Sequence, residues 1–117
     1  MGFFGMARLR SDIFVAALIR RAEAAGAFAV LRRRGAAEAG AIFVRVDDAQ
    51  GATLYGPAPM SEEAPPGVDR LFSRLHVEAH AEPIALEARL QRELSFDPDL
   101  WIVEIEDRQG RCFLELA

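Results

Sequence analysis

The stretch Trp101-Ile-Val-Glu-Ile-Glu-Asp107 decides the fold class, because apolar and polar side chains alternate along it. Successive side chains of a β-strand point to opposite faces of a sheet, so this period of two predicts a strand with one buried face. That face would carry every second residue, namely Trp101, Val103 and Ile105. The opposite face carries Ile102 and two glutamates, Glu104 and Glu106, which predicts partial contact with solvent.

Helix and turn signals flank this strand on both sides. Glu82-Pro83 predicts the start of a helix, since proline is tolerated at the first helical position. Leucines recur every four residues through that helix, which would end near Ser95. Beyond the strand, Gln109-Gly110 predicts a turn, and residues 111–116 are predicted to return as a final strand.

A second helix is predicted near the N-terminus. Ser11-Asp12 is a favourable helix cap, and Gly26 is a favourable residue just beyond a helix that ends near Ala25. Residues 13–19 are all apolar, so this helix is apolar around most of its circumference. Such a helix is buried on more than one side, either beneath a sheet or against a partner.

The segment between the two helices predicts three short strands, at residues 27–33, 41–47 and 52–55. Their short connections predict an antiparallel meander. Residues 56–67 hold four of the six prolines, which predicts an exposed loop. Residues 68–80 fit either a helix or a strand.

These elements predict a single α+β domain over residues 1–117, which is a common domain length. Apolar residues make up 51% of the chain and charged residues 27%, as in soluble globular proteins. We expect an antiparallel sheet of five to six strands, with two helices packed mainly on one face. Residues 1–7 are expected to be flexible.

The expected compartment is the cytoplasm. No apolar run approaches the roughly 20 residues of a membrane-spanning helix, and the N-terminus is too short and too weakly apolar for a secretion signal. Cys112 is the single cysteine and cannot form a disulfide within the chain, which fits a reducing compartment.

Charge is distributed unevenly along the chain. All 14 basic residues are arginine, and the formal net charge is −4. Residues 1–46 carry a net charge of +5 and residues 47–117 carry −9. The two halves either neutralise each other within the fold or across a dimer, or the first half presents a basic surface to an anionic partner.

The candidate residues for binding a ligand or a partner form one mixed-charge set: Arg20, Arg21, Arg32, Arg34, Arg45, Glu104 and Glu106. Guanidinium groups that cluster on a sheet can bind phosphate through paired hydrogen bonds. The alternative is a ladder of cross-strand ion pairs between these arginines and the two glutamates. A sequence pI near 5.2 argues against nucleic acid as the partner.

No catalytic residue is predicted, because Cys112 has no evident base and the chain has neither a nucleophile elbow nor a glycine-rich phosphate loop. The carboxylates around the strand at 101–107 are better explained by turns and a solvated strand face than by acid–base chemistry. His76, Glu78 and His80 are an alternative metal site, since imidazole and carboxylate suit a divalent ion. The other interpretation of that stretch is a solvated polar face, and we predict no bound metal or cofactor.

Two segments of the chain are similar to each other. Residues 42–55 and 101–114 share four identities in fourteen aligned positions, and each reads as a strand followed by an acidic Gln-Gly turn. A duplicated helix-and-hairpin unit would produce this pattern. Independent use of the same hairpin turn chemistry explains it more simply.

Three stretches carry a resemblance to a known family: Leu9–Gly26, Leu54-Tyr-Gly-Pro57 and Phe96-Asp-Pro-Asp-Leu-Trp-Ile-Val-Glu-Ile-Glu-Asp-Arg108. They resemble the alphaproteobacterial DUF1491 family of proteins of unknown function, over Arg8 to Leu116. The resemblance implies a small, stand-alone cytoplasmic protein and no particular chemistry. The residues themselves favour a non-catalytic interaction or adaptor protein that associates with itself. The alternative is a small domain or enzyme that binds an anionic ligand through its arginines, with or without a metal.

Overall fold

The computed structural model describes residues 9–59 and 62–117, which form two helices and five strands. The predicted flexible segment, residues 1–7, lies outside these ranges. In chain order the elements are α1 (Ser11–Ala24), β1 (Phe28–Arg33), β2 (Ile42–Asp47), β3 (Ala52–Pro57), β4 (Phe72–Arg74), α2 (Pro83–Phe96) and β5 (Trp101–Glu106). The α+β class, the two helices and the five strands confirm the prediction from the sequence.

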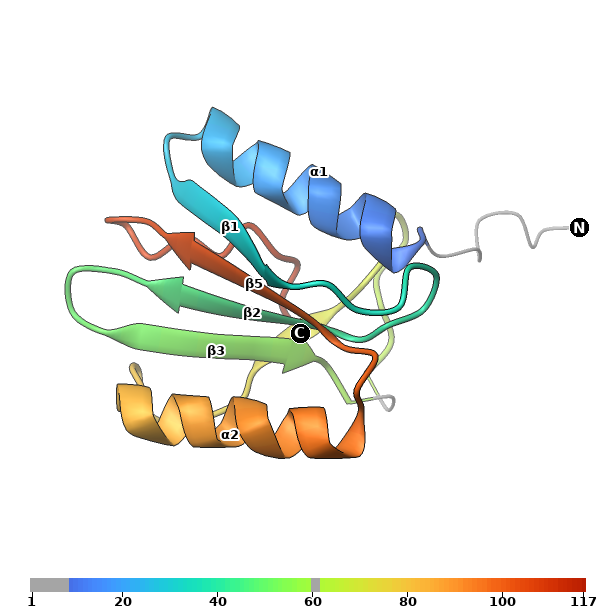
Figure 1. Ribbon diagram of the computed structural model, residues 1–117. Helices are drawn as coiled ribbons and strands as arrows, with labels where there is room; N and C mark the ends of the chain where they lie inside the picture. The colour runs from blue at the N-terminus through green and yellow to red at the C-terminus, as the bar shows by residue number, and fades with distance from the viewer. Residues whose placement is uncertain (1–8, 60–61) are drawn as a thin grey trace, which may run out of the picture.

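The five strands form one sheet in the order β1-β5-β2-β3-β4. The last strand therefore lies between the first two (Figure 1), where it pairs antiparallel with β1 and parallel with β2. The sheet is mixed, so the predicted fully antiparallel sheet and the meander of the first three strands are wrong. The physical reason is burial: Trp101, Ile102 and Val103 are each at most 1% exposed, and only a central strand buries both of its faces.

The two helices cover opposite faces of the sheet, which corrects the prediction that both lie mainly on one face (Figure 1). Helix α1 packs Val15 and Leu18 into one apolar cluster with Val44 and Val103 of the sheet. Helix α2 packs its apolar residues into a second cluster, which includes Leu86, Leu90, Leu54 and Ile102. Both faces of the central strands carry apolar residues, so a single helical layer would leave apolar surface of one face in water.

Helix α1 ends as its sequence predicts but begins differently. Gly26 follows the helix with a φ of 92°, a conformation that glycine adopts without steric cost. Ser11 makes no capping hydrogen bond to the helix backbone. Its hydroxyl is fully buried and donates to the carbonyl oxygen of Gly40 at 2.6 Å, so Ser11 ties the start of α1 to the β1–β2 connection.

The ambiguous segment 68–80 contains the short strand β4, followed by a bent segment. Gly56 and Pro57 belong to β3, so the proline-rich loop starts after them. The final strand predicted at residues 111–116 is wrong. Only an isolated bridge joins Leu116 to Phe72, because Phe113 has a φ of 62° and turns the backbone away from an extended path.

The two similar segments of the sequence lie side by side in the sheet. Strands β2 and β5 pair in the register that aligns the two segments, from Ile42 with Trp101 to Asp47 with Glu106. The turns that follow also touch, since the amide of Asp107 donates to the carbonyl oxygen of Asp47 at 3.0 Å. The shared sequence pattern therefore marks β2 and β5, two interior strands that lie next to each other in the sheet. Only the first of them continues into a hairpin.

Candidate functional site

A network of ion pairs joins the middle of the sheet to α2, and we call Arg32, Arg45, Asp47, Glu87 and Glu104 the arginine network. Glu87 of α2 lies at its centre, 2.6 Å from Arg32 Nη2 and 2.8 Å from Arg45 Nη1. Arg32 also contacts Glu104 at 2.9 Å, and Arg45 contacts Asp47 at 3.1 Å. Both guanidinium groups are thus held between two carboxylates each.

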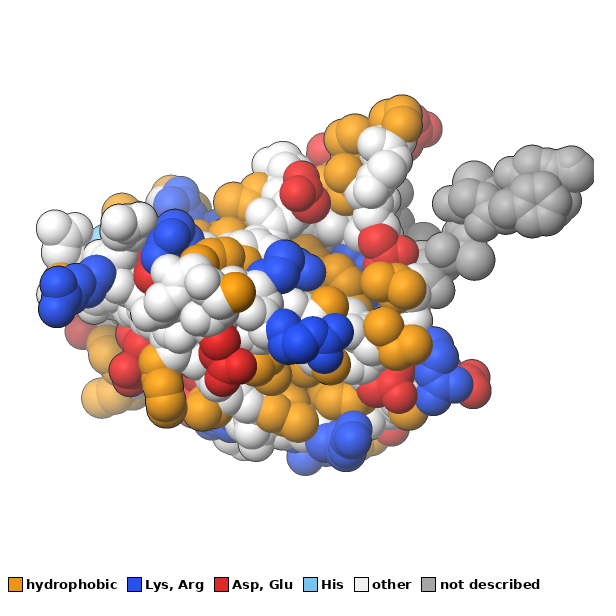
Figure 2. All heavy atoms as spheres, turned by 90° about the horizontal axis from the view of Figure 1, so that it is seen from above, with side chains coloured by type: hydrophobic (Ala, Val, Ile, Leu, Met, Phe, Trp, Pro, Cys, Tyr) orange, Lys and Arg blue, Asp and Glu red, His pale blue; other side chains and the backbone are white. Residues whose placement is uncertain are grey.

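The structure separates the arginines that the sequence analysis groups together. On the α2 side of the sheet Arg32 pairs with Glu104, as the ion-pair alternative predicts, and Arg45 joins the same network through Glu87. Arg20 and Arg21 lie on α1, which covers the opposite face. Figure 2 shows that face, where arginine side chains are scattered among apolar and acidic ones.

Two further members of the predicted set also lie outside the arginine network. The Arg34 guanidinium stands over the Trp101 ring, 5.2 Å from its centroid. Glu106 is exposed at the end of β5. Arg21 donates to the carbonyl oxygen of Phe113 at 3.1 Å rather than joining any cluster of arginines. The predicted residues therefore form no single anion-binding surface.

Electrostatics favour the charged states of Glu87 and Arg32. Hydrogen bonding to Arg32, and then the charges of Arg32 and Arg45, hold the pKa of Glu87 below its ordinary value although partial burial opposes this. The same hydrogen bond raises the pKa of Arg32. Because the carboxylates already neutralise these guanidinium groups, the network is a structural clamp between α2 and the sheet.

Glu87→Gln tests this clamp. The change is expected to lower the free energy of unfolding by about 1–2 kcal/mol at pH 7, because an amide cannot pair with two guanidinium groups. The folded-state pKa of Glu87 is depressed, so its contribution is present above the unfolded-state pKa and is lost as pH falls through the folded one. The difference between the two proteins should therefore shrink below about pH 4.

Urea unfolding at several pH values measures this difference. Glu23→Gln is the matched control, because Glu23 is exposed on α1 and far from the network in the fold. It should unfold like the unaltered protein at every pH. An equal loss in the two variants, or a loss for Glu87→Gln that persists unchanged at pH 3, contradicts the clamp.

The two histidines of the alternative metal site have separate partners. His76 Nε2 accepts a hydrogen bond from the amide of Leu54 at 3.0 Å, and its Nδ1 donates to the carbonyl oxygen of Glu78 at 2.9 Å. His80 Nε2 instead lies 3.0 Å from Asp48 Oδ2, in the β2–β3 turn. The histidines do not converge, and no group of three metal-binding side chains is found in residues 9–59 and 62–117.

Other titratable groups are stabilised in unreactive states. Burial raises the pKa of the Cys112 thiol, which disfavours the nucleophilic thiolate. Hydrogen bonds from the side chain and backbone of Arg111 lower the pKa of Asp107 to about 2. A carboxylate with so low a pKa is a poor general acid or base near neutral pH.

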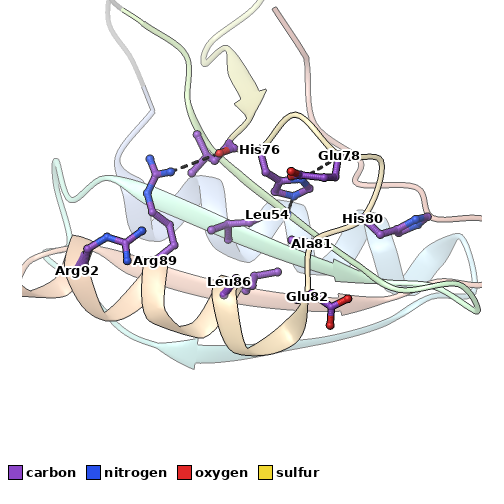
Figure 3. Close-up of a pocket in the computed structure, with 11 residues that line it drawn as sticks. Leu54, His76, Glu78, His80, Ala81, Glu82, Leu86, Arg89 and Arg92 are labelled. Carbon is purple, nitrogen blue, oxygen red and sulfur yellow. Dashed lines mark hydrogen bonds between the residues drawn. The ribbon is translucent and has the colours of Figure 1, made fainter.

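A cleft of about 360 Å³ lies between α2 and the bent segment that follows β4 (Figure 3). Leu54 and Leu86 form its apolar floor, and His76 stands beside them. Arg89 and Arg92 line one end, and Glu78 and Glu82 line the other. His76 and Glu78 belong to the alternative metal site predicted from the sequence, whereas the place of the two arginines in this cleft was not predicted.

The outer edge of β1 carries a second feature that the sequence analysis missed. Phe28, Val30 and Leu31 are 62%, 38% and 42% exposed, although all three are large apolar residues. We call these three side chains and the backbone between them the β1 edge. The near-continuous apolar run of residues 27–31 is a signal of this surface, but its exposure follows only from the place of β1 at the end of the sheet.

Neither described helix is long and apolar enough to cross a membrane. Both are 14 residues long, and each presents an exposed polar side as well as a buried apolar one. A membrane-spanning helix needs about 20 mostly apolar residues.

Comparison with known proteins identifies the family. The family model for a protein of unknown function (DUF1491) matches residues 9–115. A crystal structure of a DUF1491 family protein from Caulobacter crescentus is 39% identical and superposes with a TM-score of 0.78, covering 95% of this chain and 99% of that one. No curated protein matches the chain.

Two solution structures are similar to the same extent. A protein from A. tumefaciens is 44% identical, with a TM-score of 0.78 and coverage of 95% of this chain and 96% of that one. An NMR structure of a DUF1491 family protein from C. crescentus is 42% identical, with a TM-score of 0.77 and coverage of 95% and 98%. The resemblance seen in the sequence is thus confirmed, and the chain belongs to the DUF1491 family of proteins of unknown function.

Proposed function

We propose that this protein is a non-catalytic interaction domain that pairs with a second copy of itself along the β1 edge. The observation that carries the proposal is the exposure of Phe28, Val30 and Leu31 on a strand with one neighbour. Strand β1 pairs with β5, and no other strand of the described residues pairs with its outer side. An exposed apolar strand edge is a ready template for pairing with another chain.

The geometry of β1 suits pairing with its own copy. An antiparallel pair centred on Val30 places the two Val30 side chains opposite each other on the α2 face of the sheet. Ala29 then lies opposite Leu31 of the second copy, and Phe28 lies opposite Arg32. Each pair lies on one face, because antiparallel partners share the direction of their side chains. The two sheets would thereby become one continuous sheet.

Charge complementarity supports the same arrangement. Arg33 and Arg34 follow the centre of β1, so antiparallel pairing directs them toward the start of the other β1. An opening of mixed charge lies at that start, beside Phe28, with four carboxylates against two arginines in its lining: Asp47, Asp48, Glu106 and Asp107, and Arg108 and Arg111. Contacts between the basic first half of one chain and the acidic second half of the other would add to the ion pairs that Arg32 and Arg45 form within each chain.

Native mass spectrometry tests the pairing directly. The expected result is a dimer, with twice the chain mass of 12.9 kDa and no added ligand mass. Val30→Glu is expected to weaken association about tenfold or more, because two carboxylates then meet at the centre beside Glu104. Val77→Glu is the matched control, since Val77 is 90% exposed away from β1 and should leave the dimer intact.

Mixing two variants makes the test specific for this edge. Val30→Glu mixed with Val30→Arg should form a heterodimer, because opposite charges then meet where like charges repelled. Circular dichroism would establish that each variant is folded. A monomeric unaltered protein at 100 μM, or a dimer that Val30→Glu leaves unchanged, would overturn the proposal.

A further inference from the structure

The cleft beside α2 is divided into an apolar floor and two charged ends. The side chains of Leu54 and Leu86 are only 1% and 2% exposed, so the floor is set by the core of the domain. Leu75 and Ala81, from the bent segment, add apolar wall. This floor is therefore rigid and apolar, as in most small-molecule sites.

The basic end is formed by two arginines on the same side of α2. Arg89 and Arg92 are three residues apart, which places them on neighbouring turns of one helix face (Figure 3). Arg89 is oriented by Glu93, at 2.8 Å from its Nε, and by the carbonyl oxygen of Leu75, at 3.4 Å from its Nη1. The Nη2 group of Arg89 takes part in neither of these two hydrogen bonds. Arg92 forms no ion pair with another described side chain.

His76 contributes its imidazole ring to the wall of the cleft. Its Nε2 accepts from the Leu54 amide and its Nδ1 contacts the Glu78 carbonyl oxygen, so each ring nitrogen has a backbone partner. Both nitrogens are thus used by the fold of this segment. The ring is held as a flat wall beside Leu54 (Figure 3).

We propose that this cleft binds a small aromatic carboxylate. The aromatic ring would lie on Leu54 and Leu86 against the flat side of His76, and the carboxylate would bind Arg89 and Arg92. A volume of about 360 Å³ lies near the lower end for ligand sites, which suits one or two fused rings. Glu78 and Glu82 at the far end repel a second anionic group, so the ligand carries one negative charge.

The probe for this site is 2-naphthoate, compared with its uncharged analogue 2-naphthamide. In a two-dimensional ¹⁵N–¹H NMR titration, 2-naphthoate should shift the amide signals of Leu54, His76, Arg89 and Arg92 more than signals on α1. Arg92→Gln should weaken binding of 2-naphthoate about fivefold and leave 2-naphthamide binding unchanged, because only the carboxylate loses a partner. Arg20→Gln, on the other side of the sheet, should change neither.

A second pair of variants tests the position of the ring. Ala85 lines the cleft and is exposed, so Ala85→Phe fills the space without disturbing the core and should abolish binding of both probes. Ala88→Phe is the matched control, because Ala88 is exposed on α2 outside the cleft lining. Absence of shifts at the cleft, equal effects of the two phenylalanine variants, or no effect of Arg92→Gln would each overturn this proposal. Val30→Glu should bind 2-naphthoate normally, which separates this site from the β1 edge.

Discussion

Trp101→Ala is expected to lower the free energy of unfolding by about 3–5 kcal/mol. Trp101 is 1% exposed and is the largest fully buried side chain of the core. Its indole Nε1 donates to the carbonyl oxygen of Ala36 at 2.8 Å, and Arg34 covers the ring. Removing the ring leaves a large cavity beside the sheet and removes one of the two donors to the Ala36 carbonyl oxygen, which keeps only the Gly40 amide at 3.2 Å.

Trp101→Phe separates the two contributions. The smaller ring retains part of the packing but cannot donate to Ala36, so an intermediate loss of about 1–3 kcal/mol is expected. Trp101 is the single tryptophan, so unfolding should be followed by circular dichroism rather than by fluorescence. A loss below about 1 kcal/mol for Trp101→Ala would show that the ring does not support the core.

Gly35→Ala is expected to cost about 2–4 kcal/mol. A Cβ at residue 35 would collide with the carbonyl oxygen of Asp99 and lie 2.6 Å from the carbonyl carbon of Leu100. These are backbone atoms, so no side-chain rotation relieves the collision. The chain would have to separate there, breaking the hydrogen bond at 2.8 Å from the Ala36 amide to Asp99.

Gly67→Ala is the control for the conformational freedom of glycine. Gly67 has a φ of 86°, but a Cβ there meets nothing within 4 Å. Its substitution should cost only the backbone strain of about 1–2 kcal/mol. A loss for Gly35→Ala no larger than that for Gly67→Ala, measured by thermal or urea unfolding, would contradict the steric argument.

Local patterns were enough to locate most elements. The alternation after Leu100 predicted β5, and the leucine spacing after Pro83 predicted α2, each to within a residue of the observed bounds. Such periods are set by the geometry of a strand or a helix alone, so they can be read without the rest of the chain. The strand predicted at residues 111–116 is wrong because Phe113 has a left-handed backbone conformation, which the pattern of side chains does not indicate.

The candidate sites were predicted less completely than the elements. Pairing of Arg32 with Glu104 was predicted, but Glu87, which joins Arg32 to Arg45, was missed. Glu87 can pair with both arginines only because α2 packs on the face of the sheet opposite to α1. Nothing in the leucine spacing indicates which face of the sheet a helix will cover.

Residue order determined the α+β class, the two helices, the places of four of the five strands and the family, because each of these depends on contacts among neighbours in the chain or on local identity. The order of the strands was decided only in three dimensions, where β5 took an interior place that buries Trp101, Ile102 and Val103. That choice moved β1 to the edge and exposed Phe28, Val30 and Leu31. It also required a helix on each face, and the packing of α2 created both the arginine network and the cleft. Burial of both sheet faces is a property of the whole assembly of strands, and no single segment contains it.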